Sequence, residues 1–311
     1  MTTQKAETKR LLREQILKVW GSGKIELVDT NYAIEITDHM PVPGQPSGRE
    51  ALKDVVHQFR AGIPDMEMDL HVTLAAGDFG VDVWTLKGTH GGVLLGKPAT
   101  GRALEISGID MIRTANGQIT DLWHVEEMAV LIAQMDESPL EFGAPAAPVA
   151  NESWPQQSEV SPGANAIVPG EAGFSALEKR NLAIARRHIE EIWAGGNAEL
   201  CWEMYHPGVV DHNMAPDQKP GIEGIVDVLQ WLRESVLDLA MQIECYVIDG
   251  DMFADRWIMQ GTHTGAPLMG VPARGKSFTI NGMDVGRIDE DGLITDIWHA
   301  EEFPQLLHQV S

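Results

Sequence analysis

The chain has 311 residues, of which 43% are apolar and 22% charged, a balance typical of folded proteins rather than disordered ones. Its 46 acidic residues outnumber 23 basic ones, and the formal net charge of -23 disfavours binding to nucleic-acid phosphates or anionic membrane surfaces. No apolar stretch reaches the roughly 20 residues of a membrane helix, and the N-terminal residues lack the apolar core of a signal peptide. We therefore expect a cytoplasmic protein that binds neither nucleic acid nor membranes.

The first half of the chain predicts helices followed by strands. Helical apolar spacing in residues 9–20 ends at a glycine signal, and a short second helix and an extended piece ending in Asp38-His39 follow. Another helix is predicted for residues 49–62. Alternating patterns then predict four strands at residues 66–75, 79–89, 103–114 and 118–126, with the hairpin dipeptide Asn116-Gly117 before the last. Residues 128–135 return to a helical pattern.

The second half repeats the first. At one constant offset Trp20 matches Trp193 and Asp38-His39 matches Asp211-His212. After two single-residue insertions, "ITDLWHVEE" at residues 119–127 aligns with "ITDIWHAEE" at residues 294–302. A repeat of this length is too long for a solenoid unit. It indicates two similar domains, which we place at residues 1–137 and 177–311.

Residues 138–176 are rich in proline and show neither helical nor strand periodicity, which predicts an extended linker. Its apolar residues Phe142, Trp154 and Ile167-Val168 indicate that parts of it dock on a domain. Within each domain, helices followed by a meander of strands predict an α+β fold, in which a curved antiparallel sheet closes around a helical layer. Such a cone has an interior, and interiors of this kind bind small molecules.

Six short motifs occur in the same order in both halves. They are Asp-His after the second helix, a Gly-Asp turn, a Trp leading to Gly-Thr-His, a Gly-x-Pro-x-x-Gly loop, Gly-x-Asp-x-x-Arg, and Ile-x-x-x-Trp before the final helix. On these motifs each half, without the linker, resembles the SnoaL-like family of the nuclear-transport-factor-2-like fold. The resemblance implies two cone-shaped α+β barrels that admit a small, often aromatic or polyketide-like molecule. It also implies cofactor-independent chemistry of the cyclase, isomerase, dehydratase or lyase type.

Single-domain relatives of that family commonly pair through their sheets. The resemblance therefore implies that the two domains pair within the chain as a pseudo-dimer, and it leaves a further homodimer open. Fusion raises the effective concentration of the partner domain, so this pairing would not depend on protein concentration.

The repeated Trp-His-x-Glu-Glu ending carries the candidate catalytic residues. A histidine beside carboxylates changes its charge near neutral pH, which suits general acid-base catalysis on a ketone, ester or aromatic compound. We predict that His124 and Glu127 act in the first domain, and His299 and Glu302 in the second. The candidate substrate-binding residues are His39, Trp84, His90, Asp110 and Trp123 in the first domain and His212, Arg256, Trp257, His263, Asp284 and Trp298 in the second.

Several of these residues also have a structural interpretation. The tryptophans fit core packing, His39, His90 and their counterparts fit turns, Arg256 fits an ion pair, and one Glu of each pair fits a cap of the terminal helix. A metal ion at His124 and Glu126 is a weaker alternative because the chain has no compact His or Cys ligand pair, so we expect no metal and no cofactor. Cys201 and Cys245 likewise have no disulfide or ligand spacing.

Two other functions fit the same sequence: a non-catalytic small-molecule binding protein and a purely structural pairing protein. Convergence of the His and Glu side chains inside one cavity favours an enzyme. Cones filled by side chains favour a pairing protein.

Overall fold

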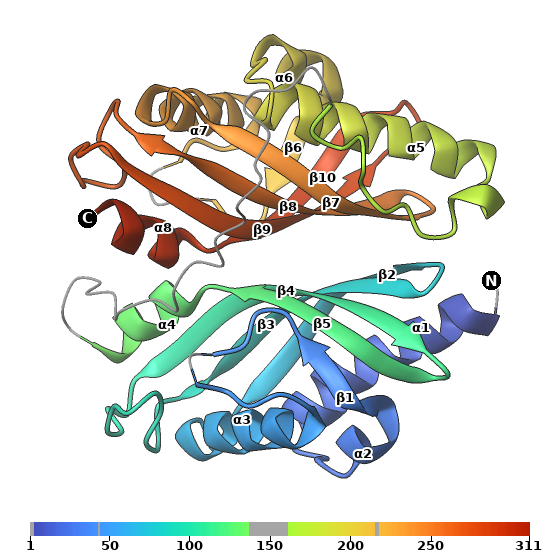
Figure 1. Ribbon diagram of the computed structural model, residues 1–311, viewed down its shortest axis with the longest axis vertical. Coiled ribbons are helices and arrows are strands. Elements are labelled where there is room, and N and C mark those ends of the chain that lie inside the picture. Colours follow the sequence, from blue (N-terminus) through green and yellow to red (C-terminus); the bar gives the residue numbers. More distant parts are fainter. Residues whose placement is uncertain (1–2, 43, 137–160, 215–217) are drawn as a thin grey trace. The chain divides into compact units, whose positions relative to one another are not determined.

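A computed structural model describes residues 3–42, 44–136, 161–214 and 218–311. The chain divides into two compact units, Met1–Glu141 and Phe142–Ser311. Each unit has one five-stranded sheet and its own helices (Figure 1). Phe142 and Trp154 of the predicted linker lie outside the described residues.

The elements of unit 1 follow the predicted order. They are helix α1 (Thr3–Glu14) with its π-helical continuation η1 (Gln15–Trp20), α2 (Leu27–Asn31), β1 (Tyr32–Asp38), α3 (Arg49–Gly62), β2 (Glu67–Ala76), β3 (Phe79–Thr89), β4 (Ala103–Ala115), β5 (Gln118–Glu126) and α4 (Met128–Met135). The four strands of the meander agree with the predicted ranges to within a residue at each end, because alternation and turn residues delimit them in the sequence.

Unit 2 repeats this series after a short 3-10 helix, η2 (Glu171–Gly173). Its elements are α5 (Ala176–Arg186) with the π-helical continuation η3 (Arg187–Trp193), α6 (Glu199–Met204), β6 (Tyr205–Asp211), α7 (Gly221–Ser235), β7 (Ala240–Asp249), β8 (Met252–His263), β9 (Lys276–Ile288), β10 (Ile294–Glu301) and α8 (Phe303–Val310). Ser175 and Glu178 form a capping box that starts α5.

The strand order is β1-β5-β4-β3-β2 in unit 1 and β6-β10-β9-β8-β7 in unit 2. The first strand of each sheet is parallel to its neighbour, and the other pairs are antiparallel. Asn116 and Gly117 both have positive φ, 52° and 76°, as a tight hairpin between β4 and β5 requires. Side chains alternate along each strand, so the inner face of the sheet receives every second residue.

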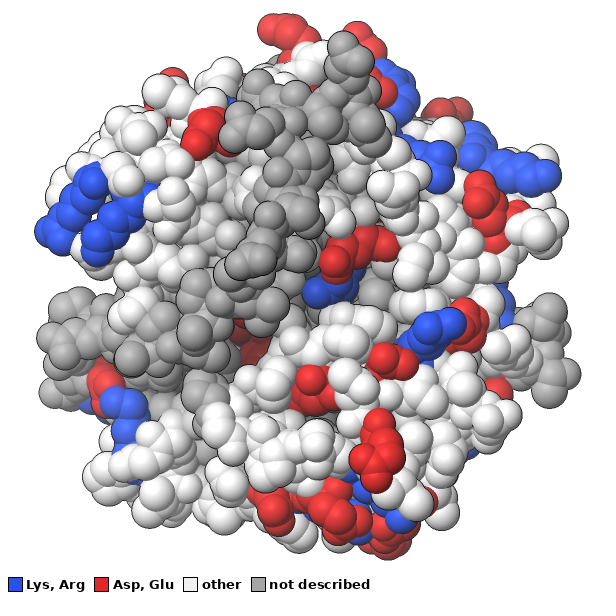
Figure 2. Space-filling view, in the orientation of Figure 1, with Lys and Arg blue, Asp and Glu red and all other residues white. Residues whose placement is uncertain are grey.

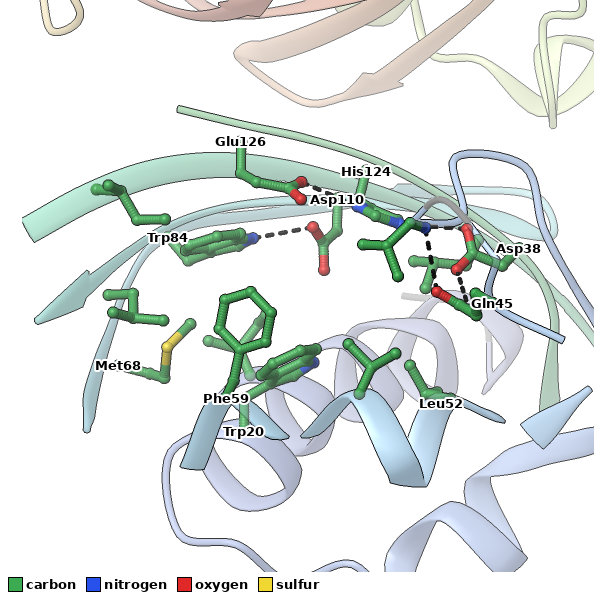
Figure 3. Close-up of a pocket in the computed structure, with 16 residues that line it drawn as sticks. Trp20, Asp38, Gln45, Leu52, Phe59, Met68, Trp84, Asp110, His124 and Glu126 are labelled. Carbon is green, nitrogen blue, oxygen red and sulfur yellow. Dashed lines mark hydrogen bonds and ion pairs between the residues drawn. The ribbon is translucent and has the colours of Figure 1, made fainter. Parts of the chain in front are cut away.

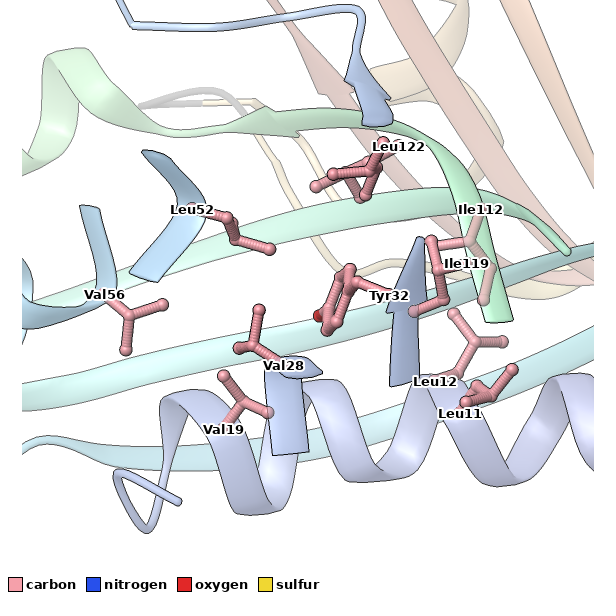
Figure 4. Packing of buried hydrophobic residues seen from close by; sticks show 11 residues of the cluster. Leu11, Leu12, Val19, Val28, Tyr32, Leu52, Val56, Ile112, Ile119 and Leu122 are labelled. Atoms are coloured by element: carbon pink, nitrogen blue, oxygen red, sulfur yellow. The ribbon is translucent and has the colours of Figure 1, made fainter. Parts of the chain in front are cut away.

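The core of unit 1 fills the space between the inner face of the sheet and the helices. Leu12 from α1, Val56 from α3 and Ile112 from β4 are almost fully buried and belong to one cluster, and Tyr32 lies among them (Figure 4). Packing of the apolar helix faces onto the sheet holds the helices in place. This packing also fixes the position of Gln15, which follows Leu12 by one turn.

Part of the predicted linker packs on unit 2. The backbone N–H of Ile167 donates to the Glu244 oxygen (2.8 Å), and the Ile167 oxygen accepts from the Tyr246 N–H (2.8 Å). Ile167 thereby forms a parallel bridge at the edge strand β7, as predicted for this part of the linker. It covers backbone groups that an open sheet edge would expose.

On the face shown in Figure 2, acidic side chains are not gathered in a single place. Figure 2 shows them interspersed with lysine and arginine on the face in view. Several are paired with a cation, among them Asp29 with Lys53 (2.7 Å) and Asp78 with Arg113 (2.7 Å). Among the described residues, no helix is both long enough and apolar enough to cross a membrane.

Candidate functional site

Unit 1 contains a cavity of about 60 Å³ between the inner face of its sheet and its helices. One ordered water needs roughly 10–15 Å³ by the same kind of measure, so the space exceeds that of a single water. Most of the wall is apolar. Trp20, Phe59 and Met68 form the side opposite Asp110, His124 and Glu126 (Figure 3). The polar side chains in the lining are Asp38, Gln45, Asp110, His124 and Glu126.

Asp110 of β4 points into this apolar space between Trp84 and His124 (Figure 3). Its Oδ1 accepts a hydrogen bond from the Trp84 indole N–H (2.9 Å), and its Oδ2 accepts one from the Gln15 amide. The π-helical turn at η1 places Gln15 here, and Gln15 in turn accepts from the Tyr32 hydroxyl (3.0 Å). π-helical turns inside α-helices often occur at functional sites.

The pKa of the Asp110 carboxyl is shifted toward neutral pH. Burial raises the pKa of this carboxyl to about 6, Glu126 also raises it, and the positive charge of His124 with the Trp84 and Gln15 hydrogen bonds acts against the rise. Desolvation is therefore the dominant cause. A carboxyl group with such a pKa can both accept and return a proton near neutral pH.

His124 of β5 is held between two carboxylates. Its Nδ1 is 2.9 Å from Glu126 Oε2, and its Nε2 is 3.2 Å from Asp38 Oδ1 at the end of β1. Burial alone would lower the pKa of His124, but Glu126 and Asp38 hold it well above its ordinary value. Asp38 is positioned by Gln45, whose amide donates to the other carboxylate oxygen (2.8 Å). His124 is therefore an imidazolium at neutral pH.

Unit 2 repeats this arrangement residue for residue. His299 lies between Glu301 (2.7 Å from Nδ1) and Asp211 (3.1 Å from Nε2), and the Gln218 amide donates to Asp211 (2.8 Å). Asp284 is the direct cross-strand partner of His299, as Asp110 is of His124. Burial likewise raises the pKa of Asp284, to about 7. The two copies thus share the arrangement of carboxylates around the histidine.

A comparison with protein families shows to which family the chain belongs. The model of the family described as SnoaL-like polyketide cyclase matches residues 10–135 and 183–310, which is most of the chain and covers both units. The chain belongs to this family. Its members are cyclase-like small-molecule enzymes or binding proteins, and the double match agrees with the tandem duplication that the sequence indicated.

Solved structures similar to this SnoaL-like chain each span about one unit of it. TsrD from Streptomyces laurentii has 22% identity, covers 43% of this chain and 97% of its own, with a TM-score of 0.40. A putative polyketide cyclase from Bacillus cereus has 22% identity, 51% and 97% coverage and a TM-score of 0.41. One from Acidithiobacillus ferrooxidans has 27% identity, 42% and 94% coverage and a TM-score of 0.37. No curated protein matches the chain.

The structure places some of the predicted site residues of this SnoaL-like chain elsewhere. His39 stacks on Trp123 with ring centroids 4.2 Å apart, and its Nε2 is 3.0 Å from Asp121. None of these three residues lines the cavity. Strand parity is the reason, since Trp123 and His124 project to opposite faces of β5.

Unit 2 has the same outer arrangement, with His212 stacked on Trp298 at 4.2 Å and bonded to Asp296 (3.0 Å). The predicted substrate-binding residues His39, Trp123, His212 and Trp298 thus lie on the face of the sheet opposite His124 and His299. They form a stack that packs the end of the first strand against the sheet.

Glu127 and Glu302 do not converge with the histidines. The Glu127 carboxylate accepts from the Ser107 backbone N–H (2.8 Å), and Glu302 accepts from the backbone and side-chain amides of Asn281 (2.8 and 2.9 Å). Each precedes its terminal helix, α4 or α8. In the structure these two residues anchor backbone and side-chain amides, and the carboxylate partners of His124 and His299 are Glu126 and Glu301.

Three further predicted residues have structural surroundings. His90 is fully buried beside Thr100, whose hydroxyl is 3.0 Å from Nδ1, and His263 is buried with Nε2 2.8 Å from the Ala266 oxygen. Both fix the loops after β3 and β8, and His90 does not line the unit 1 cavity. Arg256 pairs with Glu244 and donates to Asn281 (3.1 Å), as its structural interpretation predicted. By strand parity it projects away from Trp257 and the inner face.

Sequence reasoning missed several residues of the site. Asp38 and Gln45 lie far from His124 in the sequence, and Gln15 carries no motif. Asp82 is fully buried and is the direct cross-strand partner of Asp110; burial and Asp110 raise its pKa well above the usual range. A carboxyl at alternate spacing before Trp84, in "VDVW", and again in "ADRW" of unit 2, was the available signal, because strand parity puts Asp82 and Trp84 on one face.

Proposed function

We propose that the cavity of unit 1 is the active site of an enzyme that moves a proton on a small uncharged carbonyl compound, with Asp110 as the proton carrier. The observation that carries this proposal is the position of the Asp110 carboxyl. It faces an apolar cavity, its two oxygens are held by Trp84 and Gln15, and its pKa of about 6 is near working pH. A carboxyl held in this way is suited to remove a proton from carbon next to a carbonyl and return it to oxygen or carbon.

His124 has a supporting role in this mechanism. Both ring nitrogens are occupied by Asp38 and Glu126, so the imidazolium acts through its fixed charge rather than as a free proton donor. That charge lowers the pKa of Asp110 and keeps the carboxyl available as a base. The Asp38-His124-Glu126 arrangement is therefore a positioning and tuning device.

The residues that line the cavity limit the charge and the shape of the substrates that can bind. Asp38 and Glu126 together carry two negative charges against the single positive charge of His124, so a carboxylate or phosphate on the substrate would be repelled. Trp20, Phe59 and Trp84 offer flat apolar surfaces, which suit an aromatic or polyketide-like ketone or ester. Intramolecular aldol closure, isomerisation and the loss of water from a β-hydroxy ketone all begin with removal of a proton from the carbon next to the carbonyl, and the proposal covers that shared step.

The experiment measures proton removal directly. The full chain is incubated in D2O with a panel of uncharged aromatic ketones and esters, and NMR follows the loss of the proton next to the carbonyl. We expect exchange with at least one compound, and a loss of roughly 10²–10⁴-fold in Asp110→Asn, the usual contribution of a general base. Asp284→Asn and the double variant report any contribution of unit 2.

Exchange that survives in the double variant would overturn the assignment of the proton carrier. A compound that binds the wild type and raises its Tm, but exchanges no proton above the buffer rate, would favour the non-catalytic binding protein instead. The cavity itself counts against a purely structural pairing role for unit 1, because a pairing protein has no need of space inside the cone.

A further inference from the structure

The inner end of the cone differs between the two units at one position. In unit 1, Gln15 bridges Tyr32 and Asp110: its Oε1 accepts from the Tyr32 hydroxyl and its amide donates to Asp110. In unit 2, His188 lies at this position on η3, with Nε2 2.7 Å from the Tyr205 hydroxyl. An amide has been replaced by an imidazole, which can bind a metal ion.

His188 faces two buried acids. One ligand atom each from His188, Asp255 and Asp284 lies within 4.8 Å of the others, and this is the cluster of potential metal ligands found among the described residues. Their side chains are 0–6% exposed. Asp255 and Asp284 are direct cross-strand partners in β8 and β9, so both carboxyls project to the same inner face.

The cluster also has unused ligand atoms. Within the described part of the chain, Nδ1 of His188 and both carboxylate oxygens of Asp255 are buried without a hydrogen-bond partner. Unpaired polar atoms in such a position cost free energy unless a partner is supplied. In unit 1 the corresponding Gln15 side chain has both its oxygen and its nitrogen bonded. Asp82, the unit 1 counterpart of Asp255, also has both carboxylate oxygens without a hydrogen-bond partner, so the unpaired Nδ1 of His188 is the point at which the two units differ.

We propose that His188, Asp255 and Asp284 bind a divalent transition-metal ion in unit 2. A doubly charged cation neutralises the two buried carboxylates, and Nδ1 of His188 supplies a third ligand. A nitrogen together with two carboxylate oxygens suits Zn²⁺, Mn²⁺, Fe²⁺ or Co²⁺ better than Mg²⁺ or Ca²⁺. Three protein ligands leave a coordination position for water or a substrate oxygen.

The surroundings of His188 fit this role. With Nδ1 on the ion, the neutral ring carries its proton on Nε2 and donates it to the Tyr205 hydroxyl, the kind of outer hydrogen bond that orients a metal-bound histidine. In the structure the Trp193 indole N–H donates to the same Nε2 (3.2 Å). Once Nε2 carries a proton, this N–H would donate instead to the Tyr205 hydroxyl, with which it also interacts. The alternative is that the cluster binds no ion and that one of its carboxyls is protonated instead. Burial and Asp284 raise the pKa of Asp255 well above the usual range, so that carboxyl can stay neutral.

Measuring the metal content of the protein distinguishes a bound ion from a protonated cluster. The full chain is stripped with a chelator, exposed to Zn²⁺ or Co²⁺, freed of unbound ion and measured by mass spectrometry. We expect one ion per chain, visible ligand-field absorption in the Co²⁺ form, and a Tm that rises with Zn²⁺ concentration. His188→Gln copies the residue of unit 1 and should fold, and Asp255→Asn removes a second ligand. Both variants should lose the ion and the Tm response.

His212→Gln is the matched control, because it removes an exposed histidine from the outer face of the same unit. It should keep one ion per chain. Failure of the stripped wild type to take up either ion would overturn the proposal in favour of the protonated cluster. Equal ion content in wild type, His188→Gln and Asp255→Asn would overturn it as well, because the ion would then be bound elsewhere. Neither result depends on proton exchange by unit 1, so the proposed function is tested separately.

Discussion

Asp110 and His124 are direct cross-strand partners in β4 and β5, and their side chains lie next to each other on the cavity wall. Burial raises the pKa of Asp110 to about 6, and the charge on His124 holds it below the value that burial alone would give. The two residues are therefore coupled through their charges. A change at His124 should appear as a change in the proton affinity of Asp110.

The first prediction concerns the pH dependence of proton exchange. Only the ionised Asp110 accepts a proton, so the exchange rate should rise with pH through about 6. His124→Gln removes the positive charge and leaves Asp38 and Glu126 unpaired, and both changes favour protonated Asp110. The midpoint should move to higher pH by roughly one to three units. A pH-rate profile, with ¹³C NMR titration of the Asp110 carboxyl, measures this.

His39→Gln serves as the control for that series. His39 is bonded to Asp121 on the outer face, so its loss should leave the midpoint where it is. A midpoint that moves equally in both variants would mean that the shift reflects general loosening of the sheet rather than the charge on His124.

The second prediction separates the neighbouring acids Glu126 and Glu127. Glu126→Gln removes a carboxylate that raises the pKa of His124, so the imidazole should titrate at lower pH than in the wild type. Glu127→Gln should leave that titration unchanged and lower the free energy of unfolding by about 1 kcal/mol, because it weakens the hydrogen bond from the Ser107 N–H. NMR titration of His124 and urea denaturation measure the two effects. The opposite result would restore Glu127 as the partner of His124.

The third prediction follows from the same imidazolium. The folded-state pKa of His124 lies well above the unfolded value near 6.5, so its contribution to stability is fully present below that value. The contribution is lost as pH rises through the folded-state pKa. The free energy of unfolding should therefore fall on the alkaline side of neutrality, and the total fall should be smaller in Asp38→Asn, where the pKa elevation is smaller. Urea denaturation from pH 6 to pH 10 measures the total fall in both proteins. An equal fall would show that Asp38 does not hold the charge on His124.

The fold could be predicted from this sequence because its signals are local. The alternation of residues 79–89 and 118–126 and the Asn116-Gly117 turn each specify their own structure. The duplication then gave the domain count. Strand parity was also available, and it placed His124 with Glu126 rather than Glu127. The prediction that Glu127 acts with His124 required a departure from that parity at the strand end, and the same parity excludes Trp123 from the cavity.

The rest of the site depends on tertiary packing. Nothing in the local sequence brings Gln15, on a helix turn, to Asp110, some 95 positions later in the chain. The widened π-helical turn that aims Gln15 inward is set by packing of the helix on the sheet. Asp38 reaches His124 because β1 pairs with β5, a parallel pairing between segments far apart in sequence. Such long-range pairings leave no periodic pattern in the chain.

The last prediction concerns the packing of the Trp84 ring against Gly108. Gly108 is the direct cross-strand partner of Trp84, and a Cβ at Gly108 would lie 2.2 Å from the indole ring. Gly108→Ala should therefore displace the ring, weaken the hydrogen bond to Asp110 and lower the free energy of unfolding by about 1–3 kcal/mol, as overpacking does. Loss of that hydrogen bond should also raise the pKa of Asp110 and move the exchange midpoint to higher pH.

Trp84→Phe tests the hydrogen bond without the clash, because it keeps an aromatic ring beside Gly108 and removes only the indole N–H and the second ring. It should move the midpoint in the same direction as Gly108→Ala. Urea denaturation and ¹³C NMR titration of Asp110 give the two quantities for both variants. An unchanged midpoint in Trp84→Phe would show that the indole N–H does not tune Asp110, and the effect of Gly108→Ala would then be one of packing alone.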